Sequence, residues 1–267
     1  MSALTRISRH VHWMRPGPPD RPSLCAVVGK RHTLLLDAGS SSAHTQQFLH
    51  ALGAGGGPRP SAVVYTHADW DHVLGGIEVG GLVIAQTLTA DRLRELAAWD
   101  WSDEGLDRRV AEGLTPPGHV ADIKEELPWP RSVHVAKADV VFDASLDLHL
   151  GGVTVRVRHV GGDHSADSCV MLVEPDGVLF LGDCLSGSPE GVLTAERALP
   201  LYDAIFGFDA GLYVEGHHDS VLSRAEIAIV IEKARAAERA VGSGRTIAVQ
   251  DEDTAYFLRA FRAGRSA

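Results

Sequence analysis

The stretch Thr66-His67-Ala68-Asp69-Trp70-Asp71-His72 follows an apolar run, residues 62–65, and precedes Gly75-Gly76. The apolar run predicts a short buried strand, so the histidines and aspartates come at its end. Carboxylates crowded there without a partner would repel one another and lose hydration. A divalent cation resolves both costs, because it binds carboxylate oxygen and neutral imidazole. We therefore expect a metal site here, and the alternative is a solvated polar loop.

Three later residues of metal-binding type lie at the ends of other predicted strands. His164, Asp183 and His217 each follow a run of strand-forming residues and have a glycine nearby, which lets the backbone approach a bound group closely. Strand ends that converge on one side of a layered fold form a site. We therefore expect these three residues to join the first cluster.

Four motifs in this order resemble the metallo-β-lactamase superfamily, whose signature is H-x-H-x-D-H followed by separate His, Asp and His ligands. The resemblance implies a four-layer αβ/βα sandwich with two metal ions, which we expect to be zinc, with Mn or Fe as alternatives. The ligand set that it implies is His67 and His164 for one metal, Asp71, His72 and His217 for the other, and Asp183 bridging both.

Asp69 stands where the family usually has histidine. One interpretation is that Asp69 still ligates, because its oxygen branches from Cγ as the Nδ1 of that histidine does. The other is that the first site binds its metal ion more weakly and the enzyme uses a single metal ion. We favour ligation, since members with H-x-D-x-D-H exist. A third carboxylate makes the centre harder, which favours Mn or Fe beside Zn and raises the pKa of metal-bound water.

The rest of the pattern predicts an α+β fold in which two sheets pack together with helices outside. A hairpin is expected over residues 24–37, and a helical cap is expected as an insertion around 87–130, with helices at 91–99 and 104–114. We treat residues 1–267 as a single domain. Further strands are expected at 82–85, 132–136, 140–142, 146–150, 153–160, 168–174, 177–181 and 211–214, and further helices at 42–52, 73–77, 196–206, 224–241 and 253–261.

The composition and the charge limit the kinds of binding partner and the cell compartment that we expect. The formal charge is −10 at pH 7 and the basic residues form no patch, so we do not expect nucleic acid as a partner. No stretch reaches the roughly 18 apolar residues of a membrane span, and residues 1–15 lack the apolar core of a signal peptide. Three widely spaced cysteines fit a reducing compartment. A cytoplasmic enzyme acting on a small-molecule substrate is the expectation.

The function that these features favour is hydrolysis of an ester, lactone or thioester by a metal-bridging hydroxide, with Asp71 or Asp183 as the catalytic proton shuttle. One alternative is a phosphodiesterase or nuclease of the same fold. Another is a metal-binding or degenerate protein retained for interaction. Overhang of the metal edge by Trp99, Trp101 and Trp129 would favour an apolar substrate, whereas a ring of arginines would favour a phosphodiester.

Several neighbouring residues carry weaker hypotheses. Asp37 is expected to support the ligand loop, Asp163 to orient a ligand imidazole, and His218 to line the pocket. Asp167, together with Ser168, is expected to cap the turn into the next strand. Cys184, beside Asp183, is expected to be a small buried residue rather than a ligand.

Overall fold

One sheet occupies the N-terminal half of the fold in the computed structural model, which describes residues 4–244, 247, 249 and 251–265. Its strands run antiparallel from β1 to β4 and parallel from β4 to β7. The predicted hairpin at 24–37 is confirmed as the β3–β4 pair. The strands are β1 (Leu4–Arg6), β2 (Val11–Met14), β3 (Leu24–Val28), β4 (Thr33–Leu36), β5 (Ala62–Val64), β6 (Leu82–Gln86) and β7 (Val140–Phe142).

A second sheet has the order β13-β12-β11-β10-β9-β8 among the described residues. Its pairs are antiparallel except for β11 and β12, which run parallel and bring two strand ends to the same side. The strands are β8 (Ser145–His149), β9 (Thr154–His159), β10 (Cys169–Glu174), β11 (Val178–Gly182), β12 (Leu212–Glu215) and β13 (Leu222–Ser223).

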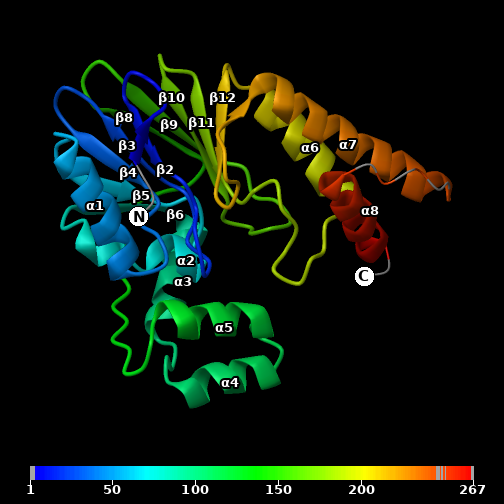
Figure 1. The fold of residues 1–267 in the computed structure, drawn as a ribbon, viewed down its shortest axis with the longest axis horizontal. Coiled ribbons are helices and arrows are strands. Elements are labelled where there is room, and N and C mark those ends of the chain that lie inside the picture. Colours follow the sequence, from blue (N-terminus) through cyan, green and yellow to red (C-terminus); the bar gives the residue numbers. More distant parts are fainter. Residues whose placement is uncertain (1–3, 245–246, 248, 250, 266–267) are drawn as a thin grey trace.

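The two sheets face each other across an apolar core to which both contribute, for example through Val27 and Leu34 from one and Val157 and Phe180 from the other. Helix α1 (Ser42–Ala54) covers the outer face of the first sheet, and α6 (Ala195–Phe206), α7 (Arg224–Ser243) and α8 (Glu252–Gly264) cover the second (Figure 1). The predicted four-layer sandwich is therefore confirmed. None of the described helices is long and apolar enough to cross a bilayer.

The predicted insertion between β6 and β7 is helical, and its α4 and α5 extend away from the sheets (Figure 1). It consists of α3 (Thr87–Ala97), α4 (Asp103–Ala111) and α5 (Pro117–Glu126). We call residues 87–130 the cap. Helix α5 was not predicted, because Pro116-Pro117 resembles a helix breaker, yet Pro117 lies in the first turn where no N–H partner is needed. The strand predicted at 132–136 is wrong, and these residues run as an irregular segment back to β7.

The segment after β5 folds more tightly than predicted. A short helix begins at Trp70 and continues to Val73, followed by a 3-10 turn at Gly76–Glu78, whereas the sequence predicted a helix only from residue 73. Gly75 and Gly76 pack closely against neighbouring residues because they have no side chain. A Cβ on Gly75 would lie 1.7 Å from the Thr45 hydroxyl oxygen. The compact turn therefore presents Asp71 and His72 from a helix instead of a loop.

Candidate metal centre

The carboxyl-terminal ends of four strands bring the predicted ligands together, in two clusters among the described residues. The first cluster is His67, Asp69 and His164. The second cluster is Asp71, His72, Asp183 and His217. His67 and Asp69 lie in the loop after β5, Asp71 and His72 in α2 (Trp70–Val73), His164 after β9, Asp183 after β11 and His217 after β12.

The first cluster places two imidazoles and one carboxylate around a common point. The Nε2 atoms of His67 and His164 lie 3.1 Å apart. Asp69 Oδ2 lies 3.6 Å from the His67 nitrogen and 3.4 Å from the His164 nitrogen. Asp69 therefore stands where a third ligand of the same ion would stand, which supports the interpretation that it ligates.

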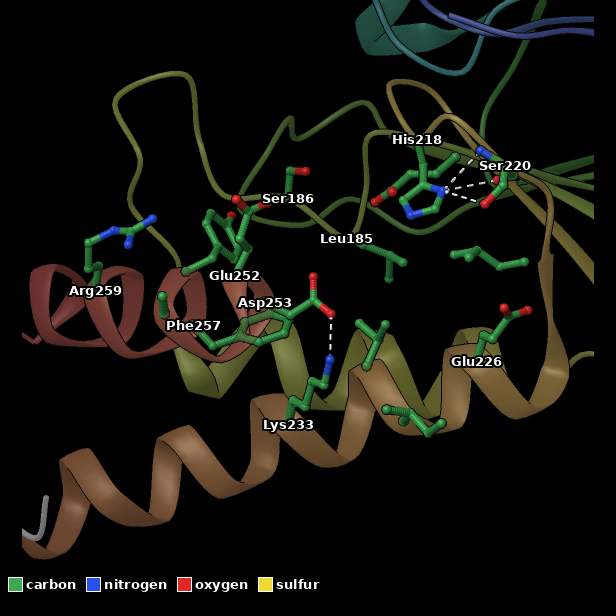
Figure 2. A pocket seen from close by; sticks show the side chains of 16 residues that line it. Leu185, Ser186, His218, Ser220, Glu226, Lys233, Glu252, Asp253, Phe257 and Arg259 are labelled. Carbon is green, nitrogen blue, oxygen red and sulfur yellow. Dashed lines mark hydrogen bonds and ion pairs between the residues drawn. The ribbon is translucent and has the colours of Figure 1, made fainter. Parts of the chain in front are cut away.

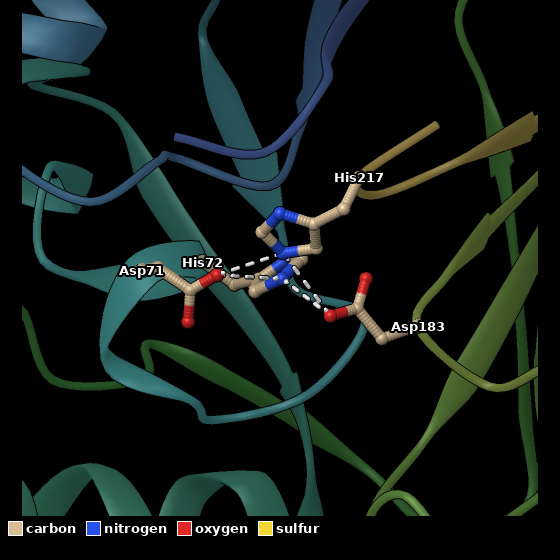
Figure 3. Close-up of side chains that lie close together, drawn as sticks. All are labelled: Asp71, His72, Asp183 and His217. Carbon is tan, nitrogen blue, oxygen red and sulfur yellow. Dashed lines mark hydrogen bonds and ion pairs between the residues drawn. The ribbon is translucent and has the colours of Figure 1, made fainter. Parts of the chain in front are cut away.

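In the second cluster, the imidazoles of His72 and His217 alternate with two carboxylates, and all four side chains point toward one another (Figure 3). Asp71 Oδ2 lies 3.1 Å from His217 Nε2 and 3.2 Å from His72 Nε2. Asp183 Oδ2 lies 3.2 Å from His217 Nε2 and 3.4 Å from His72 Nε2. These contacts close a ring of four ligand atoms.

Asp183 links the two clusters. The same Oδ2 atom that faces His72 and His217 lies 3.7 Å from His164 Nε2 in the first cluster. A Cβ on Gly216 would lie 1.9 Å from Asp183 Oδ1, so only glycine at this position lets the carboxylate occupy its place. The position of Asp183 agrees with the bridging role that the resemblance implies.

Both clusters have the dimensions of a metal site. Ligands about 2.1 Å from a shared tetrahedral ion lie about 3.4 Å from one another, and the distances above range from 3.1 to 3.7 Å. Two buried atoms of the second cluster, His72 Nε2 and Asp183 Oδ1, have no hydrogen-bond partner among the described residues. Buried polar atoms without partners cost free energy unless something binds them. The donor set, imidazole with carboxylate, suits Zn, Mn or Fe.

The charges of the second cluster require positive charge at its centre. Burial by itself lowers the pKa of His217, but the carboxylates of Asp183 and Asp71 outweigh burial and raise that pKa to about 11. Burial alone would likewise raise the pKa of Asp183, but the imidazoles of His72 and His217 hold it well below its usual value. Ligation needs neutral imidazole, so a bound cation would replace the protons of these histidines.

Asp37 supports the second cluster from behind. Its Oδ2 atom lies 2.8 Å from His72 Nδ1 and accepts a hydrogen bond from the Thr66 hydroxyl (2.7 Å), and its Oδ1 atom accepts from the Thr66 N–H (2.6 Å). The bond to Nδ1 fixes the tautomer that turns His72 Nε2 toward the cluster. The bonds to Thr66 confirm the expected support of the ligand loop, and the contact with His72 was not predicted.

Asp167 holds the loop of the first cluster, a role the sequence did not suggest. Its Oδ2 atom accepts hydrogen bonds from the Ala68 N–H (2.9 Å) and the Thr89 hydroxyl (2.8 Å), and its Oδ1 atom accepts from the Ser165 hydroxyl. Asp167 thus ties the ligand loop, helix α3 of the cap and the loop of His164 together. The expectation that it only caps the next strand is therefore corrected.

Two further acids differ from expectation. Asp163 accepts hydrogen bonds from the Thr194 N–H and hydroxyl at the start of α6, and no contact joins it to an imidazole among the described residues, so the predicted orienting role is wrong. Asp20 was overlooked. Its Oδ1 atom lies 3.4 Å from Nδ1 of His217, and burial, with help from Asp71, raises the pKa of Asp20 to about 6.

A cavity of about 630 Å³ opens beside the first cluster, and we call it the cleft. Asp69 and His164 form one side of it, and the cap forms the other. Of the three tryptophans whose overhang of the metal edge would favour an apolar substrate, only Trp99 lines the cleft among the described residues. Trp101 packs on Trp99, and Trp129 is 62% exposed. The charged side chains lining the cleft are Arg92, Arg109, Arg197, Glu95, Asp163 and Glu190.

A second cavity, of about 700 Å³, lies between α7, α8 and the end of β12 (Figure 2). The ion pair of Lys233 and Asp253 (2.8 Å) crosses it. None of the seven predicted ligands lines it, although His218 does. His218 Nδ1 is 3.0 Å from the Ser220 carbonyl oxygen and joins neither cluster. Cys184 is buried, its pKa is raised by that burial, and it also joins neither cluster.

Comparison with known proteins identifies the fold family. The sequence profile described as "Metallo-beta-lactamase superfamily" matches residues 18–240. A search of curated proteins finds no match.

Solved structures resemble the chain at low sequence identity. A metallo-beta-lactamase family protein from Thermus thermophilus is 17% identical with a TM-score of 0.65, over 98% of this chain and 95% of that one. A metallo-beta-lactamase from Pontibacter korlensis is 20% identical with a TM-score of 0.59, over 87% and 98%. A stereoselective inverting sec-alkylsulfatase from Pseudomonas sp. is 15% identical with a TM-score of 0.68, over 96% of this chain but 47% of its own. At these identities the similarity shows a common fold.

Proposed function

The chain belongs to the metallo-beta-lactamase superfamily, whose members are generally metal-dependent hydrolases, and on this basis we propose that it hydrolyses a small-molecule ester, lactone or thioester at a two-metal centre. The observation that carries the proposal is the shared position of Asp183, whose Oδ2 atom lies within 3.7 Å of imidazole nitrogens from both clusters. We propose two zinc ions, with Mn or Fe as alternatives, held by His67, Asp69 and His164 and by Asp71, His72 and His217, with Asp183 between them.

The residues have distinct tasks under this proposal. Cations held in the two clusters would supply Lewis-acid polarisation of the scissile carbonyl and a water nucleophile at neutral pH. Asp71 and Asp183 are the carboxylates available to take a proton and deliver it to the leaving group. Asp183 Oδ1 is available because no described residue bonds to it. Asp37 keeps His72 Nδ1 occupied, so that its Nε2 atom stays turned to the centre.

The substrate reaches the centre through the cleft in this proposal. Its volume of about 630 Å³ is within the usual range for small-molecule sites, and the cap limits its extent on one side. Trp99, with the Arg109 guanidinium stacked on its ring, lines the cleft, and so does the loop of His164. A polymer such as nucleic acid would need a longer open groove, and the chain carries a formal charge of −10.

Phosphodiester hydrolysis is the second candidate, and one observation favours it. Three arginines line the cleft, as expected for an anionic substrate. Two of them face acids of the protein, since Arg92 lies 3.9 Å from Asp69 and Arg197 lies 3.6 Å from Asp163. This partial neutralisation leaves the carboxylic ester class as our first choice.

A hydrolysis screen tests the proposal. Zn, Mn and Fe forms of the protein are assayed on matched 4-nitrophenyl esters, γ- and δ-lactones, acyl thioesters and bis-4-nitrophenyl phosphate, with Asp183→Asn as the inactive control. We expect turnover of an acyl substrate that Asp183→Asn abolishes. Turnover of the phosphodiester alone would replace the first candidate by the second.

A non-enzymatic metal-binding or interaction protein is the remaining alternative, and metal analysis separates it from an enzyme. Protein purified without added metal is expected to carry close to two equivalents of transition metal. A metal-free preparation that stays inactive on every substrate class after reconstitution would favour the alternative.

We also propose that residues 1–267 form one domain in a reducing cytoplasmic compartment. The family profile covers most of the chain, and the described cysteines, Cys25, Cys169 and Cys184, are buried free thiols. Limited proteolysis that releases a stable fragment would contradict the single domain.

A further inference from the structure

Arg109 is a cation held in place without an ion pair in the described chain. It lies on α4 of the cap, and its guanidinium stacks on the ring of Trp99, 3.4 Å from the ring centroid. Its Nε–H donates to the Thr115 hydroxyl (3.0 Å). No carboxylate of the described chain forms an ion pair with Arg109, and its two terminal nitrogens have no partner there. A stacked guanidinium with its fork free is suited to bind an oxyanion through two parallel hydrogen bonds.

A second guanidinium adds to this positive charge. Arg92, on α3, lines the same cleft, and its Nη2 atom reaches only to 3.9 Å from Asp69. Burial lowers the pKa of Arg109, and repulsion from Arg92 adds to that effect against the attraction of Glu112. Two guanidinium groups on one wall of the cleft repel each other, and an anion bound between them offsets that repulsion.

Asp69 is a weak competitor for Arg92. Its carboxylate also faces His67 and His164, and if it holds a metal ion its charge is shared with that ion. Of the other acids of the cleft, Glu190 accepts from the Ser188 hydroxyl and Asp163 from Thr194, and Glu95 forms no ion pair with Arg92 or Arg109 in the described part of the chain. The arginine wall therefore keeps positive charge to offer a substrate.

We propose that the Arg109–Arg92 wall of the cleft binds an oxyanion of the substrate, a carboxylate or phosphate group that is not the bond cleaved. This inference rests on the proposed function for the identity of the scissile bond, and it names the substrate class as anionic esters or thioesters. Arg109, fixed by Trp99 and Thr115, sets the position of the anion, and Arg92 joins it from the side nearer to Asp69.

The kinetic test compares two substrates of equal chain length. 4-Nitrophenyl hydrogen glutarate carries a remote carboxylate, and 4-nitrophenyl pentanoate carries a methyl group in its place. We expect Arg109→Gln to lower kcat/KM for the glutarate ester by about 10- to 100-fold, as for loss of a charge-assisted hydrogen bond, and to leave the pentanoate ester within about 2-fold. Arg92→Gln is expected to have a smaller effect in the same direction.

Two matched control variants make the same change of charge outside the cleft. Arg108 lies on the same helix as Arg109 and pairs with Asp100, and Arg94 lies on the same helix as Arg92 and pairs with Asp91. The controls are Arg108→Gln and Arg94→Gln. Both variants should behave as the wild type on both esters. An equal loss in Arg108→Gln and Arg109→Gln would reduce the effect to general electrostatics and overturn the inference.

A binding measurement separates this inference from the proposed function. Glutarate and inorganic phosphate are titrated into the metal-loaded protein by calorimetry, which needs no turnover. Binding of either ion that Arg109→Gln loses and Arg108→Gln keeps would support the anion site even if no ester is hydrolysed, and the stronger of the two identifies the group. Absence of binding of both ions at millimolar concentration, with no preference for the glutarate ester, would overturn it.

Discussion

The two ligand clusters differ in how they are supported. In the second cluster, the side chains of His72 and Asp71 are 0% and 7% exposed, that of His217 is 37% exposed, and Asp37 contacts an imidazole directly. In the first cluster, Asp69 is 19% exposed at the wall of the cleft, and Asp167 holds the loop through its backbone and through the cap. The comparison indicates one proposed ion position supported by direct contact with an imidazole, beside one whose residues are coupled to the cap.

Removing the carboxylate shared by both clusters should have the largest effect. Asp183→Asn replaces a charged oxygen with a neutral amide where three imidazoles converge, so both ion positions lose a ligand. We expect activity to fall about 10³-fold or more, because metal ions supply several kcal/mol of transition-state stabilisation. Metal content by mass spectrometry should fall in parallel, and two retained equivalents would show that the clusters are independent.

Weakening the support of the second cluster should have the next largest effect. Asp37→Ala removes the acceptor at His72 Nδ1 and the acceptor of both Thr66 donors, of which the hydroxyl also lies 3.0 Å from His67 Nδ1 in the first cluster. We expect metal affinity to fall about 10- to 100-fold at the second cluster and by a smaller factor at the first. Competition with a chelator should then give two steps, with the larger displacement at one of them. Asp139→Asn, whose carboxylate accepts from the Val83 N–H far from the centre, is the control.

Weakening the support of the first cluster should affect binding of metal and of substrate together. Asp167→Asn keeps the shape but cannot accept from Ala68, Thr89 and Ser165 at once as a carboxylate does. We expect about a 10-fold loss of affinity at the other ion position and a rise in KM, because α3 of the cap loosens. Asp139→Asn, whose carboxylate accepts from the Val83 N–H and does not line the cleft, should leave both unchanged.

Changing the unusual ligand should have the smallest effect on rate and a clear effect on metal choice. Asp69→His replaces a hard oxygen with an imidazole near His67 and His164. We expect the ratio of zinc to manganese bound at equilibrium with equal concentrations of both to rise several-fold. A ratio that does not change would show that Asp69 is not a ligand and would revive the one-metal interpretation.

The pattern of apolar and polar residues predicted most strands and which residues follow them at the candidate site. This succeeded because each proposed ligand follows an apolar run that ends in a glycine-containing turn. Pattern failed where a contact joins distant segments. Asp20 meets His217 and Asp167 meets Ala68 and Thr89 only after the sheets pack, whereas Asp163 looked relevant merely because it precedes His164. Contacts between residues so far apart in the sequence leave no periodic signal.

The cap shows the same limit at the level of elements. Helix α5 begins at Pro117, although the sequence Pro116-Pro117 predicted a break. Residues 132–136 alternate between apolar and polar types as a strand does, but they lie outside the sheet. Trp101 and Trp129 could not be told from Trp99 by composition, and only the folded arrangement shows which tryptophan reaches the cleft.

The insertion leaves the first sheet after β6 and returns to its parallel neighbour β7, so both of its ends join adjacent strands. Such an insertion can be replaced as a unit, because another helical segment of suitable length can be placed between the same two strands without altering their register. The contacts to keep are the hydrogen bond from the Thr89 hydroxyl to Asp167 and the bonds from Arg21 and Ser41 to Glu126 of α5. Selectivity can be redesigned in this way while the residues that we propose as metal ligands stay unchanged.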